Sequence, residues 1–144
     1  MSVTVDRAAL DRALQDALKA LRDTRPVMRA IGRVLESNVE IRFDTKTAPD
    51  GSAWKPWAKS TAKQRAKEGR GTLLEYTGRM RASLAVNVQK NEVEIGFGVP
   101  YAQFVEVTRP VLLDKGQLGK EDADDVMDAA LKSIKKQMRL EGVS

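Results

Sequence analysis

Apolar positions near the amino terminus repeat at intervals of three and four residues. Between Asp6 and Asp23 they are Leu10, Ala13, Leu14, Ala17, Leu18 and Leu21. This spacing puts an apolar stripe on one face of a helix, and the side-chain oxygen of Thr4 or Asp6 can cap its first turn. Pro26 suits the first turn of a second helix, because that turn tolerates a fixed φ and a missing N–H. The second helix carries Val27, Ile31, Val34, Leu35 and Val39 towards Phe43.

The helical spacing stops after Asp44, where turn-forming residues begin. The segment Pro49–Gly51 and then Pro56 supply a fixed φ followed by a residue free to adopt positive φ. This predicts a structured turn and a loop, which carries Trp54 and Trp57. An indole is a large apolar surface, so we expect at least one of them to be anchored.

Two short helices are expected before the pattern changes again. The segment 59–67 has a capping-box signal and no strand signal, which predicts a short basic helix. Residues 77–81 predict a turn that leads into a second short helix ending near Ser83 or Leu84.

Apolar and polar residues alternate beyond Leu84, on either side of Lys90 and Asn91. The apolar positions are Val86, Val88, Val93, Ile95 and Phe97. This period of two predicts an antiparallel hairpin with one buried face, and Gly96 allows close approach of another backbone. The segment 101–107 is apolar but of undetermined type, and 108–113 can form a last edge strand interrupted at Pro110.

A final helix is expected from Lys120 onward. Its apolar positions are Val126, Met127, Ala130, Leu131, Ile134 and Met138. Its acidic start and basic end match the helix dipole. The order of elements predicts an α+β fold, in which a small antiparallel β-sheet packs against long amphipathic N- and C-terminal helices. A length of 144 residues suits one domain spanning 1–144.

The composition removes most common enzyme chemistries. Hydrophobic residues make up 42% of the chain, enough to bury a core, but histidine and cysteine are both absent. Disulfides, thiol nucleophiles, histidine-based triads and ordinary zinc sites are therefore excluded. No apolar run approaches the roughly 20 residues that span a bilayer, and the first residues form no signal-peptide core. We expect a protein that is soluble inside a cell, contacts no membrane and needs no cofactor.

The net charge of +5 is concentrated in the segment 52–90. That segment holds two acidic residues, Glu68 and Glu75, and nine basic ones: Lys55, Lys59, Lys63, Arg65, Lys67, Arg70, Arg79, Arg81 and Lys90. It can meet nucleic acid or an acidic protein surface, or it can be a solvated helix face.

Carboxylates offer no convincing active site or metal site. One group lies at the start of the final helix: Glu121, Asp122, Asp124, Asp125 and Asp128. Carboxylates suit Mg²⁺ or Ca²⁺, but this group lacks the glycine and spacing of a calcium loop, so a dipole-matched helix start is the better interpretation. A pair such as Glu75 and Glu92 has no accompanying catalytic group. We assign no catalytic, metal or cofactor-binding residue.

Aromatic residues cluster in the same region as the positive charge, between residues 43 and 104. Such a mixture can stack single-stranded nucleic acid. Core packing accounts for Phe43 and Phe97, which leaves Trp54, Trp57 and Tyr101, with Phe104, as candidates for an interface. Arg79 and Arg81 are further candidates, because guanidinium groups pair well with carboxylates of a neighbour, although an intramolecular pair or a solvated charge is equally open.

Three segments together resemble the virion morphogenesis and tail-completion proteins of tailed, Mu-like bacteriophages. They are PDGSAWKPWAKST from Pro49, LLEYTGRMRASL from Leu73 and VEIGFGVPYAQF from Val93. The positions that match the family are Pro49, Asp50, Gly51, Trp54, Thr77, Gly78, Arg79, Ser83, Gly96, Tyr101 and Ala102. The later RPVLL and the acidic helix start are also similar to the family's closing segment. The chain departs from the family at Gln103–Glu106, where a His-Gln-x-Gly stretch is common, and in a short loop before Arg109.

The resemblance implies a structural role without chemistry. Such a protein completes the tail end in the neck of the virion and supports head–tail joining, after assembly in the host cytoplasm. A protein that closes a tube is expected to form a homo-oligomeric ring and to meet the tail tube or terminator and the head–tail connector proteins. The alternative is a nucleic-acid-binding module that uses the basic segment 52–90. A toxin or nuclease would require a metal-dependent activity.

Overall fold

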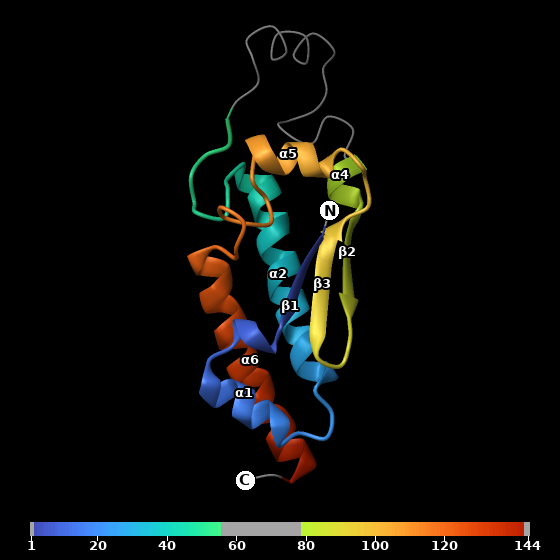
Figure 1. Ribbon diagram of the computed structural model, residues 1–144, viewed down its shortest axis with the longest axis vertical. Coiled ribbons are helices and arrows are strands. Elements are labelled where there is room, and N and C mark those ends of the chain that lie inside the picture. Colours follow the sequence, from blue (N-terminus) through green and yellow to red (C-terminus); the bar gives the residue numbers. More distant parts are fainter. Residues whose placement is uncertain (1, 56–78, 143–144) are drawn as a thin grey trace, which may run out of the picture.

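The computed structural model describes residues 2–55 and 79–142. Within them lie three strands, a 3₁₀ turn and five helices (Figure 1): β1 (Ser2–Asp6), η1 (Arg7–Ala9), α1 (Arg12–Lys19), α2 (Arg25–Thr45), α4 (Arg79–Ala82), β2 (Leu84–Val88), β3 (Glu92–Phe97), α5 (Ala102–Thr108) and α6 (Lys120–Glu141). The predicted basic helix at 59–67 falls outside the described residues.

The three strands form one antiparallel sheet in the order β1-β3-β2. The predicted hairpin is confirmed, because Val86 lies opposite Ile95 and Val88 lies opposite Val93. Val93, Ile95 and Phe97 are buried, as the alternation requires. The α+β prediction is also confirmed.

Helix α2 covers one face of the sheet, and α6 runs beside α2 (Figure 1). Gly32 allows the close approach of α2, because a Cβ atom at this position would lie 2.8 Å from a methyl carbon of Val86. The predicted stripe of α2 is buried at Val27, Ile31, Leu35, Val39 and Phe43 and partly buried at Val34. Val126, Ala130 and Ile134 of α6 are buried too. Both long helices therefore begin and pack much as their patterns predict.

The first predicted helix is wrong in its extent. Residues 2–6 form β1, and α1 begins only at Arg12. The cause is local: Asp11 accepts a hydrogen bond from the amide of Leu14 and so caps α1, while Asp6 accepts one from Ala8 and starts η1. The alternating Val3 and Val5 suit a strand better than a helix.

The predicted last strand at 108–113 is also wrong. Residues 102–108 form helix α5, and the chain from Arg109 to Leu113 is irregular. The short helix predicted after residue 78 is confirmed as α4, with Ser83 donating its amide to the carbonyls of Arg79 and Met80.

Candidate assembly surface

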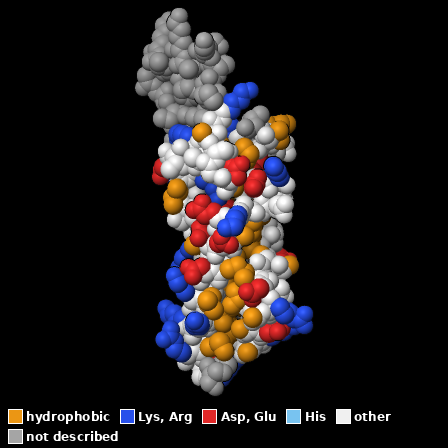
Figure 2. Space-filling model, turned by 90° about the vertical axis from the view of Figure 1, so that its left-hand side faces the viewer, with side chains coloured by type: hydrophobic (Ala, Val, Ile, Leu, Met, Phe, Trp, Pro, Cys, Tyr) orange, Lys and Arg blue, Asp and Glu red, His pale blue; other side chains and the backbone are white. Residues whose placement is uncertain are grey.

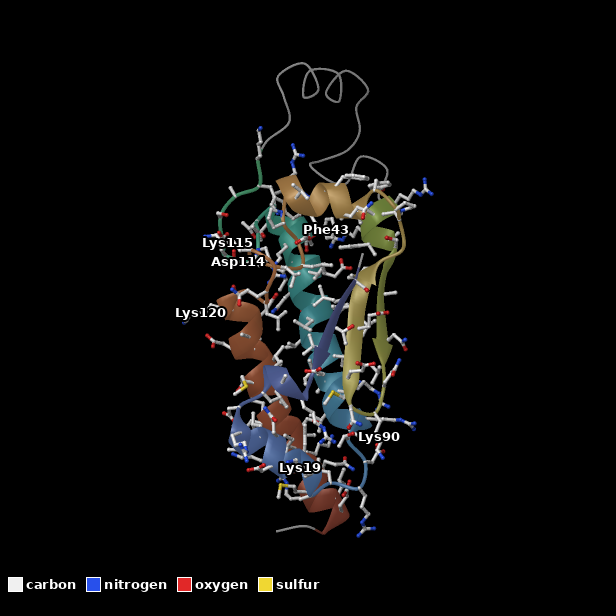
Figure 3. All side chains as sticks on the ribbon, in the orientation of Figure 1. Lys19, Phe43, Lys90, Asp114, Lys115 and Lys120 are labelled. Carbon is white, nitrogen blue, oxygen red and sulfur yellow. The ribbon has the colours of Figure 1, made fainter. Side chains whose placement is uncertain are left out.

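Three aromatic rings fix the turn after α2 to the rest of the chain. Phe43 packs edge-to-face against Trp54 and Phe97, with ring centroids 5.7 and 5.9 Å away. Phe43 lies on α2 at the end of the molecule where α5 crosses (Figure 3). Trp54 is only 4% exposed, and its Nε1 donates to the carbonyl of Pro110 at 2.7 Å. The tryptophan is therefore an anchor within the chain, and its side chain is not exposed for a partner.

The turn itself is built from the Pro-Asp-Gly residues. Asp50 Oδ1 accepts from the amide and the hydroxyl of Ser52, and Gly51 has φ of +88°, which favours glycine. The hydroxyl of Ser52 is the main cause that lowers the pKa of Asp50, and the Ser52 amide adds to it. Pro49 packs against Gly119, where an added Cβ would meet the Pro49 carbonyl oxygen at 2.9 Å. These contacts explain the residue types in the turn as structural.

A buried ion pair lies beneath this turn. Arg42 of α2 pairs with Asp122 of α6, and both side chains are almost fully buried. Arg42 Nη1 also donates to the carbonyl of Val111 at 2.8 Å, and Asn38 donates to Asp122 at 2.8 Å. Burying two charges is costly unless each is paired and hydrogen-bonded, as it is here. The pair joins α2, α6 and the irregular segment 109–113.

Sequence reasoning missed this pair, although both residues carry a signal. Arg42 stands on the apolar stripe of α2, next to Phe43, and Asp122 stands four residues before Val126 on the stripe of α6. A charged residue on an apolar stripe needs a buried partner. The acidic group at the start of α6 therefore includes one carboxylate that is structural, and no group of three metal-ligating side chains occurs among residues 2–55 and 79–142.

Glu106 explains why the segment after α5 is not a strand. Its two carboxylate oxygens accept from the amides of Val111, Leu112 and Leu113, at 2.9 to 3.0 Å. These amides would otherwise need partners in a sheet. Glu106 lies in the stretch where the chain departs from the family pattern, and here it holds the loop that carries Pro110.

Arg81 is engaged inside the chain. Its Nε donates to Glu40 at 2.7 Å and its Nη1 to Asp44 at 2.8 Å, and its guanidinium lies over the ring of Phe43. The intramolecular alternative therefore describes this arginine. Arg79 is exposed on the same short helix.

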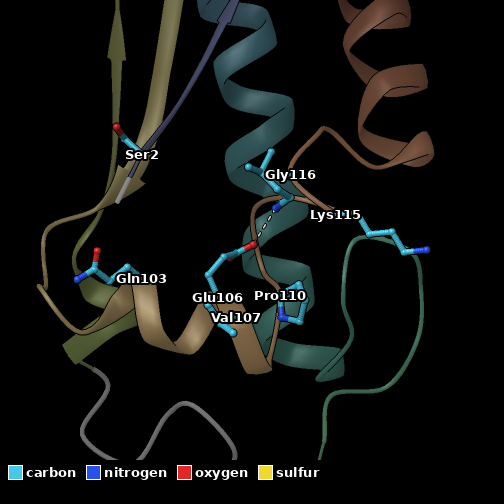
Figure 4. Close-up of a pocket in the computed structure, with 8 residues that line it drawn as sticks. Ser2, Gln103, Glu106, Val107, Pro110, Lys115 and Gly116 are labelled. Atoms are coloured by element: carbon cyan, nitrogen blue, oxygen red, sulfur yellow. Dashed lines mark hydrogen bonds between the residues drawn. The ribbon is translucent and has the colours of Figure 1, made fainter.

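Helix α5 leaves an apolar face in solvent. Tyr101 is 38% exposed, Phe104 69% and Val107 82%. Their spacing of three residues puts them along one side of the helix. Beside this face lies an open hollow of about 630 Å³ (Figure 4). It is lined by Ser2, Gln103, Glu106, Val107, Pro110, Leu113, Lys115 and Gly116.

We call the face of Tyr101, Phe104 and Val107, together with this hollow, the α5 surface. Two of the sequence-predicted interface residues, Tyr101 and Phe104, lie on it, and Val107 was missed because its segment had no assigned type. Three predicted residues, Trp57, Thr77 and Gly78, fall outside the described residues. Gly96 lies in β3 opposite Ser2 and Ala85, where strands on both sides approach it.

The basic segment 52–90 is described only in part. Four of its nine basic residues, Lys55, Arg79, Arg81 and Lys90, lie among the described residues.

The α5 surface offers hydrophobic contact area with a few polar groups at its margin, which is the chemistry of protein–protein recognition.

Comparison with known proteins finds a matching family. A sequence model of the phage virion morphogenesis family matches residues 5–104, which include every motif position of the resemblance from Pro49 to Ala102. No significant match is found among curated proteins or among solved structures. No helix among the described residues is long and apolar enough to cross a membrane.

Proposed function

This chain belongs to the phage virion morphogenesis family, and on that basis we propose that it completes the end of the phage tail and supports the joining of tail to head. Family membership makes its role one of virion assembly. The proposed action is non-enzymatic: the protein binds other virion proteins and leaves their covalent structure unchanged. Its place in the finished particle would be the tail end or neck.

The observation that carries this proposal is the α5 surface. Phe104 and Val107 expose most of their side chains, and the hollow beside them is lined by further apolar groups from Pro110 and Leu113. Contiguous exposed apolar area on a soluble domain marks a protein interaction site. The partners proposed for it are the tail tube or terminator and the head–tail connector proteins.

The backing of this surface suits a docking role. The Trp54 indole, the Glu106 carboxylate and the Arg42–Asp122 pair all fix the segment 109–113 behind α5. A rigid surface loses little conformational entropy when it binds. Several identical copies arranged in a ring would present the same surface repeatedly to a tubular partner, with head-to-tail contacts that close by rotation.

The test is complementation of a phage that lacks the gene. Phe104→Ser with Val107→Ser should leave thermal unfolding nearly unchanged, because both side chains are exposed in the free protein. Loss of an interface anchor of ~2 kcal/mol weakens binding about 30-fold, so infectious titre should fall, and unjoined heads and tails should accumulate. Leu140→Ser is the matched control, since Leu140 is 71% exposed near the C-terminal end of α6, at the opposite end of the molecule from α5 (Figure 1). A normal titre for the double variant would reject the α5 surface as the docking site.

A further inference from the structure

Among the described residues, the sheet has two edge strands, β1 and β2. Gln89 donates its amide to Glu92, and Gly98 donates its amide to Ser83, so even-numbered residues of β3 direct their backbone groups towards β2. The backbone groups of Val93 and Ile95 therefore form hydrogen bonds with β1, where their partners are the backbone groups of Val5 and Val3.

The remaining backbone groups point outward. In β1 these groups belong to Ser2, Thr4 and Asp6. In β2 they belong to Val86 and to the residues two positions before and after it, Leu84 and Val88. Within the part of the chain that the structure describes, no further backbone hydrogen bond reaches either edge. Open strand edges are templates for pairing with another chain.

The β1 edge faces an open groove. A hollow of about 550 Å³ follows the strand along all five of its residues. Its opposite wall is formed by Leu113, Gly116, Gln117, Leu118 and Ala123. Leu113, Leu118 and Ala123 supply apolar groups on this wall, and the strand offers backbone groups on the other, which suits an added strand.

The side of the molecule next to β2 is basic. Arg25, Arg29 and Arg33 are exposed and spaced four residues apart, so they form a row along α2. No hydrogen bond or ion pair of their side chains is found among the described residues. Helical geometry places the row beside Gly32, which touches Val86 of β2, and away from the α6 side. The hydroxyl of Thr24, bonded to the carbonyl of Lys90, ties the start of the row to the β2–β3 turn.

The opposite side of the molecule, formed by α6, carries acidic side chains next to basic ones. Figure 2 shows a group of acidic side chains above a column of hydrophobic ones on the side formed by α6. Asp124 and Asp128 are exposed there, and among residues 2–55 and 79–142 the ion-pair partner of each is an exposed lysine of its own helix. Lys120 and Lys90 mark the two opposite sides in Figure 3. Surface pairs of this kind contribute little, so these carboxylates can exchange partners.

We propose that copies of this chain join head to tail by placing β2 of one copy beside β1 of the next. The arginine row of the first copy then faces Asp124 and Asp128 in the second. β1 and β2 are both antiparallel to β3, so they run in the same direction. Rotating a copy about an axis along the strands keeps that direction, so β2 of one copy and β1 of the next form a parallel pair. The inference rests on the ring of the proposed function and names the faces that form it.

The absence of cysteine from the chain allows a direct test by disulfide trapping. Thr4 and Asn87 both lie opposite Glu94, on either side of β3. Within one chain they are two strand spacings apart, about 9.6 Å, beyond the roughly 7 Å that a disulfide spans. A bond between cysteines at these positions must therefore join two copies.

Three double variants cover the register, each combining Asn87→Cys with Ser2→Cys, Thr4→Cys or Asp6→Cys. Each double variant is oxidised while it assembles on tails and is then run on a non-reducing gel. At least one double variant should give a ladder of crosslinked species that ends at the closed ring. Each single variant should stay monomeric. Assembled oligomers in which no double variant crosslinks would overturn the inference and leave the proposed function standing. Dimers formed by a single variant would show an isologous contact and also overturn it.

Charge reversal supplies a second readout. Arg29→Glu with Arg33→Glu should lower the fraction of protein in oligomers about tenfold, and adding Asp124→Arg with Asp128→Arg to the same chain should restore it. Lys19→Glu, an exposed change on α1, is the control. Unchanged oligomers together with weaker binding to duplex DNA would assign the arginine row to nucleic acid and reject the contact. Completed tails with no oligomer at all would instead contradict the ring itself.

Discussion

The two ends of the molecule are held together in different ways. At one end, which we call the motif end (residues 42–55, 79–83 and 98–125), irregular segments are tied by side-chain hydrogen bonds, from Trp54, Glu106 and Arg42. At the other, the helical end (residues 7–35 and 126–142), α1, α2 and α6 pack through apolar side chains. The fully buried ones there are Leu18, Val27, Met28, Ile31, Val126, Ala130 and Ile134.

The difference follows from backbone chemistry. A helix satisfies its own amides and carbonyls, so the helical end packs mainly through apolar contact. Its α1–α2 connection takes Glu141 as a side-chain partner for the amides of Arg22 and Asp23. The segment 109–113 has no such ladder, and its backbone groups take side chains as partners. Of the family motif positions, Pro49, Asp50, Gly51 and Trp54 lie at the motif end, where Trp54 supplies one of these hydrogen bonds. The same end presents the exposed apolar side chains of α5.

The largest expected effect is at the buried ion pair. Asp122→Ala leaves the Arg42 charge buried without its carboxylate partner, which costs about 3–5 kcal/mol of unfolding free energy. Denaturant unfolding would measure it. Asp124→Ala, an exposed acid two residues away, is the control and should change stability by less than about 0.5 kcal/mol. A loss below about 1 kcal/mol for Asp122→Ala would show that the pair does not hold the motif end.

The helical end should respond to cavity formation instead. Leu18 has no exposed surface, and Leu18→Ala removes apolar contact and leaves a void, at a cost of about 2–4 kcal/mol. Leu140→Ala on α6 is the control, because Leu140 is 71% exposed. If both changes cost the same in chemical denaturation, packing of this end would not depend on Leu18.

A single hydrogen bond should matter at the motif end. Trp54→Phe keeps the aromatic contact with Phe43 but removes the Nε1 donor, so the Pro110 carbonyl loses its partner. We expect a loss of about 1–2 kcal/mol. Trp54→Ala should disrupt folding more severely, because it also removes a buried indole. An unchanged melting temperature for Trp54→Phe would mean that another group satisfies this carbonyl.

The smallest effect should be pH-dependent and confined to the helical end. Glu141 accepts from the Arg22 amide, from Gln137 and from the Asp23 amide, and these bonds hold its pKa below the usual 4.5. A carboxyl whose folded pKa is lowered stabilises the protein above pH 4.5 and loses that effect as the pH falls through the folded pKa. Glu141→Gln should therefore slightly lower the melting temperature at pH 7 but not at pH 3. An equal decrease at both pH values would contradict this origin.

The sequence predicts the two ends unequally. Long helices and the hairpin follow from periodicity, because many residues repeat one pattern, as in Val86 to Phe97. The alternating pattern that predicts strand β1 consists only of Val3 and Val5. Its partner strand, β3, lies some 90 residues away in the sequence. The conformation of α5 and of the segment after it depends on the hydrogen bonds that Glu106 accepts from three backbone amides. No local sequence pattern predicts this contact.

The candidate site shows the same division. Tyr101 and Phe104 were identifiable as aromatic residues in a region of undetermined structure. The burial of Trp54 and the engagement of Arg81 depend on where Pro110, Glu40 and Asp44 lie in space. Tertiary contacts between distant segments decide which conspicuous side chains are available to a partner.

Electron microscopy of tails from a phage that lacks this gene, with the purified protein added back, tests the central claim most directly. We expect a ring of added density at one end of each tail, the end that then joins heads. We expect no added density when the Phe104→Ser, Val107→Ser variant is used. Protein that fails to bind tails, or that binds along their length without regard to the ends, would contradict the account.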